Sequence, residues 1–187
     1  MKKIVASFLV LVAGTALMGG KLGKVDLPDT VSVGGEELVL NGAGWRKKLI
    51  IKVYAGALYL KGKSADAASI IQADEPMAVH MHFTYGVKPK QLTDAWNDGF
   101  KASLGGNTAA LQQKIDAFNA LFTEKAGKGD IYQIVYQPGT GVSVRFNGET
   151  VGTVEGLDFK KAVFGIWLGE KLADGNLGKL KKTMLGK

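Results

Sequence analysis

The sequence predicts an α+β protein in which helices cover one face of an antiparallel β-sheet. Three observations predict this class. Apolar segments change along the chain from strand-like to helical, then back to strand-like and again to helical. Pairs of turn residues, Gly34-Gly35 and Asn147-Gly148, separate neighbouring strand-like segments as in tight hairpins. Apolar residues recur at helical spacing after Pro89, which is typical of an amphipathic helix.

The composition indicates one ordinary globular domain. The chain has 187 residues, of which 46% are hydrophobic and 22% are charged, with no internal repeat and no low-complexity linker. It contains no cysteine, which excludes a disulfide framework, a thiolate nucleophile and a cysteine-based metal site. The net charge of +7 comes from lysines spread along the chain, so we expect a solvated basic face and no nucleic-acid partner. We also expect no cofactor.

The N-terminus has the pattern of a secretory signal peptide. Lys2 and Lys3 precede an uncharged apolar stretch, residues 4–18, and small residues follow it. The stretch is short for a membrane span, although an uncleaved anchor is the alternative. We therefore predict a signal peptide over residues 1–20, a mature domain over 21–187, and a periplasmic or secreted location in a bacterial cell.

The first half of the domain is predicted to be mainly strands. Residues 31–40 form a hairpin, residues 41–44 form a glycine-rich turn, and residues 45–60 form one long strand. Its odd positions are apolar from residue 49 to 57 and predict a core face. Arg46 and Tyr54 occupy even positions eight residues apart, where they line a cleft for an anion or a carbonyl, or face solvent on an open sheet.

The rest of the chain follows the same logic of turns, caps and periodicity. A short helix is expected over residues 67–71, a strand over 77–85, and two helices that begin at Pro89 and Thr108. Three strands joined by tight turns then precede two C-terminal helices; the strands are residues 131–137, 142–146 and 149–154.

Two histidines are the strongest candidate metal ligands. His80 and His82 lie on one face of the strand over 77–85, which is a common ligand spacing. No acidic residue nearby offers a third ligand, so we expect a partly exposed sheet face and no metal site. The chain also has no G-x-S-x-G segment, which argues against a serine hydrolase of the α/β type.

Two segments resemble a known family. Residues 41–60, NGAGWRKKLIIKVYAGALYL, resemble the first signature of the chalcone isomerase superfamily. Residues 147–169 resemble the second signature of its bacterial chalcone isomerase-like branch. The resemblance spans residues 30–185 and implies an open-faced β-sandwich, with a long antiparallel sheet, a layer of helices on one face, and a ligand cleft between them.

The resemblance also implies roles for single residues. Arg46 matches the cleft arginine, which grips a carboxylate in fatty-acid-binding members and stabilises developing negative charge in isomerases. Tyr54 stands where plant isomerases have a threonine, and a tyrosine resembles the fatty-acid-binding members. Tyr85 and Asn97 are further candidates for the cleft, although the segment does not match the Tyr, Lys and Asn pattern of the plant enzymes.

The sequence thus predicts an exported, non-catalytic protein that binds a small apolar acidic molecule such as a fatty acid. The alternative is an intramolecular lyase of the chalcone isomerase type, acting on a phenolic substrate. A third possibility is a collapsed cleft and a role through protein contacts alone. Whether Arg46 and Tyr54 converge on a pocket separates the third possibility from the first two.

Overall fold

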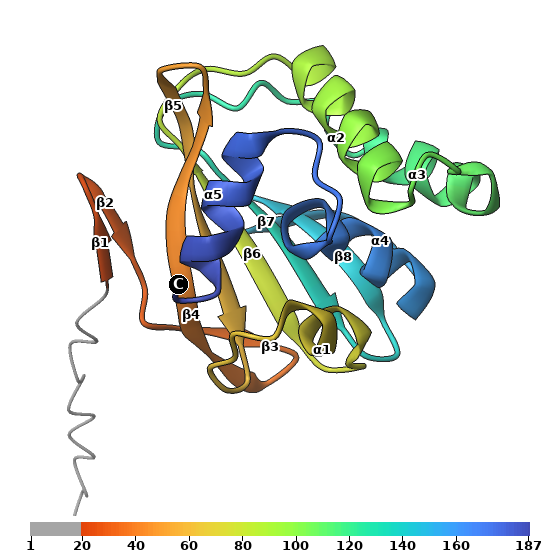
Figure 1. Cartoon of the computed structure of the whole chain (residues 1–187), viewed down its shortest axis with the longest axis horizontal. Helices are drawn as coiled ribbons and strands as arrows, with labels where there is room; N and C mark the ends of the chain where they lie inside the picture. The colour runs from red at the N-terminus through yellow and green to blue at the C-terminus, as the bar shows by residue number, and fades with distance from the viewer. Residues whose placement is uncertain (1–19) are drawn as a thin grey trace, which may run out of the picture.

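A seven-stranded antiparallel sheet forms the centre of the protein (Figure 1). The structure, a computed structural model, describes residues 20–187. Each strand pairs with the next along the chain, so the topology is a simple meander. The strands are β3 (Thr30–Val33), β4 (Glu36–Lys48), β5 (Ile51–Leu60), β6 (Met77–Phe83), β7 (Ile131–Gln137), β8 (Gly141–Phe146) and β9 (Glu149–Val154).

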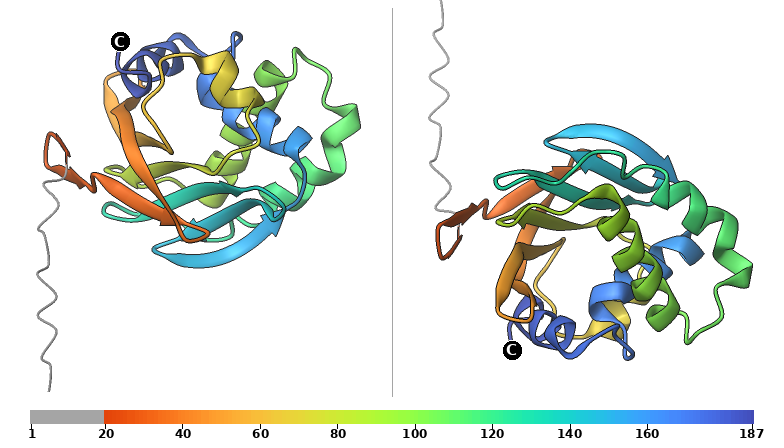
Figure 2. Two further views of the ribbon diagram at one scale, coloured as in Figure 1. Left: turned by 90° about the horizontal axis from the view of Figure 1, so that it is seen from below. Right: turned by 90° about the horizontal axis from the view of Figure 1, so that it is seen from above.

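Helices lie on one face of this curved sheet (Figure 2). They are α1 (Ala67–Gln72), α2 (Pro89–Ser103), the short 3₁₀ helix η1 (Ala109–Leu111), α3 (Gln112–Asn119), α4 (Leu157–Leu168) and α5 (Gly175–Met184). This arrangement confirms the predicted α+β class with an open-faced sandwich. Within residues 20–187, no helix is long and apolar enough to cross a bilayer.

Aromatic side chains fill the space between the sheet and the helices. Trp96 of α2 packs edge-on against Phe118 of α3 and Trp167 of α4, with ring centroids 5.3 Å and 5.5 Å away. Such pairs add roughly 0.5–1.5 kcal/mol each beyond the area they bury. The sheet contributes large apolar residues to the same core, including Leu58, Val79, Met81, Phe83, Tyr132 and Ile134.

A smaller apolar cluster covers part of the opposite face of the sheet. Tyr59 and Ala57 of β5 belong to it, together with Leu27 of a separate two-stranded hairpin, β1 (Gly20–Leu22) and β2 (Val25–Leu27). The prediction that the odd positions from 49 to 57 share one core face is therefore right only in part. Ala55 and Ala57 are buried, but on this second face, whereas Leu49 and Ile51 are exposed.

The segment over residues 41–60 folds differently from the prediction. Residues 41–44 are no turn, because they lie within β4, where Asn41 is an extra residue opposite β5. The predicted long strand is instead broken at Leu49 and Ile50, which join β4 to β5. The sequence does not predict this turn, because neither leucine nor isoleucine is a usual turn residue.

Candidate functional site

Arg46 and Tyr54 are direct neighbours on two adjacent strands. The β4–β5 hairpin pairs them across the ladder, on the face of the sheet that the helices cover. Side chains of directly opposed residues have Cβ atoms about 5 Å apart. The two residues that the sequence placed eight positions apart on one strand are thus brought together by the turn between them.

The guanidinium of Arg46 holds the carboxylate of Asp174. Its Nη1 donates to Oδ1 at 2.9 Å and its Nη2 donates to Oδ2 at 2.6 Å, which is the two-pronged geometry that arginine forms with carboxylates. The Arg46 side chain is 17% exposed and that of Asp174 is 44% exposed, so solvent reaches the pair. A further bond from Nη1 to the carbonyl of Lys47, at 2.8 Å, fixes the orientation of the guanidinium.

Asp174 is also the N-cap of α5. Its Oδ1 accepts the backbone N–H groups of Asn176 and Leu177 at 2.9 Å and 3.1 Å. Burial by itself would raise the pKa of Asp174, but the bond and charge of Arg46, with these backbone bonds, outweigh it and hold the pKa below its usual value. The carboxylate is therefore ionised at neutral pH.

The glycines of β4 let α5 approach the sheet closely. A Cβ on Gly42 would overlap the backbone oxygen of Thr183, and a Cβ on Gly44 would overlap the Thr183 hydroxyl. Gly56 of β5 has the same role, since a Cβ there would lie 2.9 Å from Cε of Met184. Their function is close packing of a helix, and this replaces the left-handed turn that the sequence predicted.

The two ends of α5 are fastened by the same strand. Arg46 holds Asp174 at the N-terminal end, and the side-chain amide of Asn41 donates to the carbonyl of Met184 at the C-terminal end, at 2.7 Å. Figure 1 shows α5 lying along β4 and β5. The segment from Asn41 to Arg46 is thus the part of β4 on which α5 packs.

The phenol of Tyr54 lies against α4. Trp167 donates its indole N–H to the Tyr54 oxygen at 3.0 Å, and the Tyr54 ring packs against Phe83 with centroids 5.5 Å apart. Desolvation raises the pKa of Tyr54, while the Trp167 bond and the Arg46 charge oppose this rise. The phenol therefore keeps its proton at neutral pH. Among the hydrogen bonds of residues 20–187 it accepts this one and donates none.

An open groove of about 900 Å³ lies between α1, the C-terminal end of α4 and the C-terminal end of α5, whereas Arg46 and Asp174 meet at the N-terminal end of α5. Apolar residues such as Ile71, Leu168 and Leu185 line it together with Lys181 and Lys187. Neither Arg46 nor Tyr54 is among its lining residues. Leu168 directly follows Trp167, the partner of Tyr54, in α4.

The other two predicted ligand residues lie at the surface. Tyr85 follows β6 and is 52% exposed, and its backbone N–H bonds to the carbonyl of Val53 at 3.3 Å. Asn97 is on the exposed side of α2 and accepts a bond from Asn119 of α3 at 2.7 Å. The structure therefore brings Arg46 and Tyr54 together but joins neither Tyr85 nor Asn97 to them by a hydrogen bond. Their roles as ligand residues stay predictions.

His80 is buried on the face of the sheet that the smaller apolar cluster covers. It is 5% exposed, packs on Tyr59 with ring centroids 4.6 Å apart, and shares a 3.2 Å contact between its Nε2 and the amide of Gln133. Desolvation, then the neighbouring His82 and Arg145, lower its pKa to about 3. Within residues 20–187, no three His, Cys, Asp or Glu side chains are grouped so as to hold a metal ion.

Comparison with known sequences decides the family. A sequence model described as chalcone isomerase-like matches residues 19–186. The chain belongs to the chalcone isomerase-like family. This confirms the family predicted from the two signatures, while the bacterial branch stays a prediction. No curated protein sequence matches the chain at a significant level.

A solved structure shows the same fold. A fatty-acid binding protein of Arabidopsis thaliana superposes with a TM-score of 0.66, and the match covers 86% of this chain and 91% of that chain. The two sequences are 20% identical, so this likeness establishes the chalcone isomerase-like fold and nothing finer.

The sequence interpretation missed the partners of Arg46 and Tyr54 in this family member. Asp174 carries one local signal, since it precedes a helical segment and aspartate is a favoured N-cap. Nothing local indicates that it reaches Arg46, which lies 128 positions away. The helical spacing of apolar residues around Trp167 indicates a core residue. Only the fold shows that its indole N–H donates to Tyr54.

Proposed function

We propose that this chalcone isomerase-like protein is a non-catalytic binding protein for a small apolar acid, such as a fatty acid. The observation that carries the proposal is the pairing of Arg46 with a carboxylate. Asp174 shows that the guanidinium has the position and orientation to hold a carboxylate with both nitrogens. The likeness in fold to a fatty-acid binding protein supports the same conclusion.

The acid head group exchanges with Asp174 in this proposal. A ligand carboxylate takes the two guanidinium bonds, and the O–H of Tyr54, on the opposed strand, donates a third. Asp174 keeps its backbone bonds to Asn176 and Leu177, so α5 remains capped when Arg46 is released. Binding then costs one ion pair that is partly exposed to solvent, which is a small free energy.

We place the apolar tail in the open groove beside the C-terminal part of α5. Aromatic side chains fill the space between the sheet and α2, α3 and α4. The groove is lined by Leu168, Leu185 and Ile71, and each methylene that it removes from water contributes about 0.8 kcal/mol. The groove lies at the C-terminal end of α5 and the head-group site at its N-terminal end, so a ligand that occupies both extends along α5.

Binding fits the site better than ring closure does. The ordinary pKa of Tyr54 is 10.0 and desolvation raises it further, so at neutral pH the phenol can donate a hydrogen bond and is no base. The lyase is the alternative that the experiment below also examines.

We also propose that the protein is exported by a bacterium to the periplasm or the medium. The support is the sequence pattern of residues 1–20, which lie outside the described residues except for Gly20. Mass spectrometry of the protein from its own host would test this, because the proposal expects a chain that begins near residue 21.

The binding proposal is tested on protein purified gently from its host. Native mass spectrometry should find a bound fatty acid, and added fatty acids should raise the melting temperature of the delipidated protein. The Arg46→Gln variant should lose this shift, and a fatty alcohol of equal length should produce a smaller one. No bound lipid and no shift in wild type would overturn the proposal, and conversion of a chalcone faster than in buffer would favour the lyase.

A further inference from the structure

The tip of the β4–β5 hairpin exposes an unusual set of apolar side chains. Leu49 is 86% exposed, Ile50 is 94% exposed and Ile51 is 41% exposed. They are consecutive in sequence and occupy the point where the hairpin turns. Isolated exposed apolar residues are common, but three in a row at a protruding tip are a feature that marks interaction sites.

The folding of the hairpin does not explain these residues. Two-residue turns favour asparagine and glycine, and the β8–β9 hairpin of the same chain has Asn147 and Gly148 there. Leu49 instead adopts a positive φ of 55°, which is unfavourable for a leucine. The tip therefore carries residues that cost stability both by their exposure and by their backbone conformation. Such a cost is typical of a functional position.

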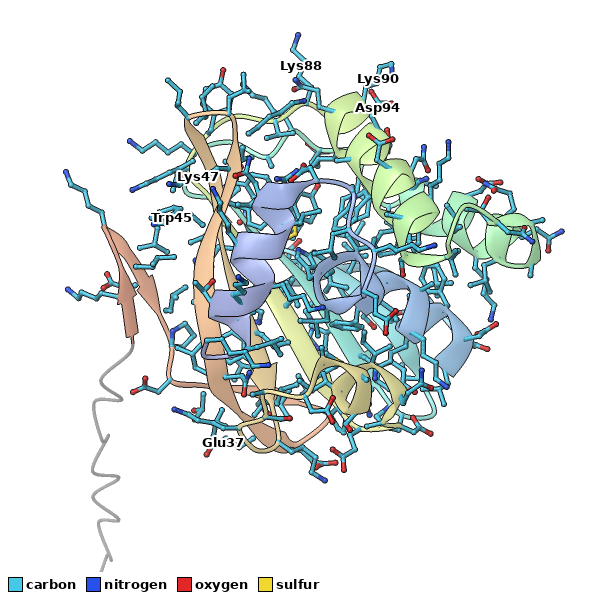
Figure 3. The ribbon with its side chains drawn as sticks, viewed as in Figure 1. Glu37, Trp45, Lys47, Lys88, Lys90 and Asp94 are labelled. Atoms are coloured by element: carbon cyan, nitrogen blue, oxygen red, sulfur yellow. The ribbon has the colours of Figure 1, made fainter. Side chains whose placement is uncertain are left out.

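Three lysines lie directly behind the apolar tip. Lys47, Lys48 and Lys52 are exposed on the strands directly behind it, and none forms an ion pair within residues 20–187. Lys52 lies over the half-buried ring of Trp45, 4.6 Å from its centroid. Figure 3 shows Lys47 and Lys88 at the end of the molecule where the hairpin turns, and Glu37 at the opposite end.

We propose that this tip docks the protein on an anionic lipid bilayer. Leu49 and Ile50 enter the boundary between head groups and acyl chains, and the three lysines bind the anionic head groups above it. A narrow apolar point with basic residues behind it suits a fluid surface that closes around it, whereas a protein partner would need a matching cavity. The inference does not rest on the proposed ligand, since it uses no residue of that site.

The test is binding of the full chain to vesicles of phosphatidylglycerol and phosphatidylcholine, measured by co-sedimentation. Leu49→Ser/Ile50→Ser should reduce partitioning by at least about tenfold, and Lys47→Gln/Lys48→Gln should weaken it and flatten its dependence on salt. Val151→Ser, on exposed β9, and Lys179→Gln/Lys182→Gln, on α5, are the matched controls. Any binding by the N-terminal segment is common to all variants, so it cancels in the comparison.

A second measurement reports the tip itself. Because the chain has no cysteine, an Ile50→Cys variant takes one environment-sensitive fluorophore. Its emission should shift to the blue with anionic vesicles and stay unchanged with pure phosphatidylcholine, and a Val151→Cys label should not respond. Equal partitioning of the tip variant and wild type, or no shift at position 50, would overturn the proposal. So would a blue shift that follows protein concentration without lipid, since it would assign the tip to contacts between copies of the chain.

Discussion

Arg46 of β4 and Asp174 at the N-cap of α5 are joined by two hydrogen bonds, of 2.9 Å and 2.6 Å, although 128 positions separate them in the chain. These bonds hold α5 against β4, the strand with which the first family signature begins. They also occupy the group that the proposed ligand needs. Arg46 therefore links the packing of α5 to the occupancy of the site.

The first prediction concerns the stability that this pair supplies. Arg46→Lys replaces a two-pronged contact with a point charge, and we expect a loss of about 1 kcal/mol in the free energy of unfolding, measured with urea. Lys90→Gln is the control, because its pair with Asp94 is an exposed contact within one helix and should cost less than about 0.5 kcal/mol. Equal losses in the free energy of unfolding would show that the Arg46–Asp174 pair stabilises the protein no more than an exposed ion pair does.

The second prediction concerns the close approach of α5. Gly44→Ala introduces a Cβ that overlaps the hydroxyl of Thr183, so we expect a destabilisation of about 1–3 kcal/mol. Thr183→Ala removes the overlapping atom, and the double variant should recover part of the loss. Gly62→Ala is the control, since open space surrounds its Cβ position. If a double-mutant cycle gave additive changes in the free energy of unfolding for positions 44 and 183, the proposed packing would be contradicted.

The third prediction concerns Lys160, which is fully buried in α4. Its ammonium donates to the carbonyls of Ile70, Ile71 and Ala73 at 2.7–2.9 Å, at the end of α1. Lys160→Met keeps the volume but leaves these acceptors without a donor, and we expect a loss of roughly 2–4 kcal/mol.

Hydrogen exchange locates that effect. The amides of α1 should exchange faster in Lys160→Met than in wild type, because the helix loses its cap. Lys179→Met, at an exposed position on α5, should change neither stability nor exchange appreciably. Unchanged protection of α1 in Lys160→Met would show that the three bonds are not what holds the helix.

The fourth prediction is a loss of stability in mild acid caused by His80. Its pKa is about 3 in the folded protein against 6.5 when unfolded, because burial opposes its charge. As the pH falls below 6.5, the unfolded chain binds a proton that the folded protein does not, so stability falls by up to about 1.4 kcal/mol per pH unit.

His80→Gln should remove this contribution. Urea unfolding between about pH 6.5 and 5.5 measures it, since few carboxylates titrate there. The variant should keep a weaker slope from His82, whose pKa burial also lowers. A slope equal to that of wild type would mean that His80 is charged in the folded protein.

Much of the fold is predictable from local pattern. The α2 helix begins at Pro89 as its sequence indicates, and the Asn147-Gly148 turn joins β8 to β9 as expected. The β4–β5 hairpin is not predictable, because Leu49 and Ile50 continue an apolar run and adopt a turn that their types disfavour. Its stability comes from pairing along both strands rather than from its turn residues.

The site is predictable only in part for a similar reason. The family signatures point to Arg46 and Tyr54, which the structure places side by side. Their partners Asp174 and Trp167 come from distant helices, and only tertiary packing brings them to the sheet. The glycines at 42 and 44 show the same limit, because a glycine needed for a turn and one needed for close packing look alike in a sequence.

The fifth prediction tests the central claim that Arg46 exchanges Asp174 for a ligand carboxylate. Calorimetric titration of a long-chain fatty acid compares wild type with Arg46→Gln and Asp174→Asn. Asparagine remains a good N-cap but does not compete as a charge, so Asp174→Asn should bind several-fold more tightly than wild type, and Arg46→Gln about 10- to 100-fold more weakly. If Asp174→Asn binds no more tightly than wild type and Arg46→Gln binds equally well, Arg46 serves only to fasten α5 and the proposed site is wrong.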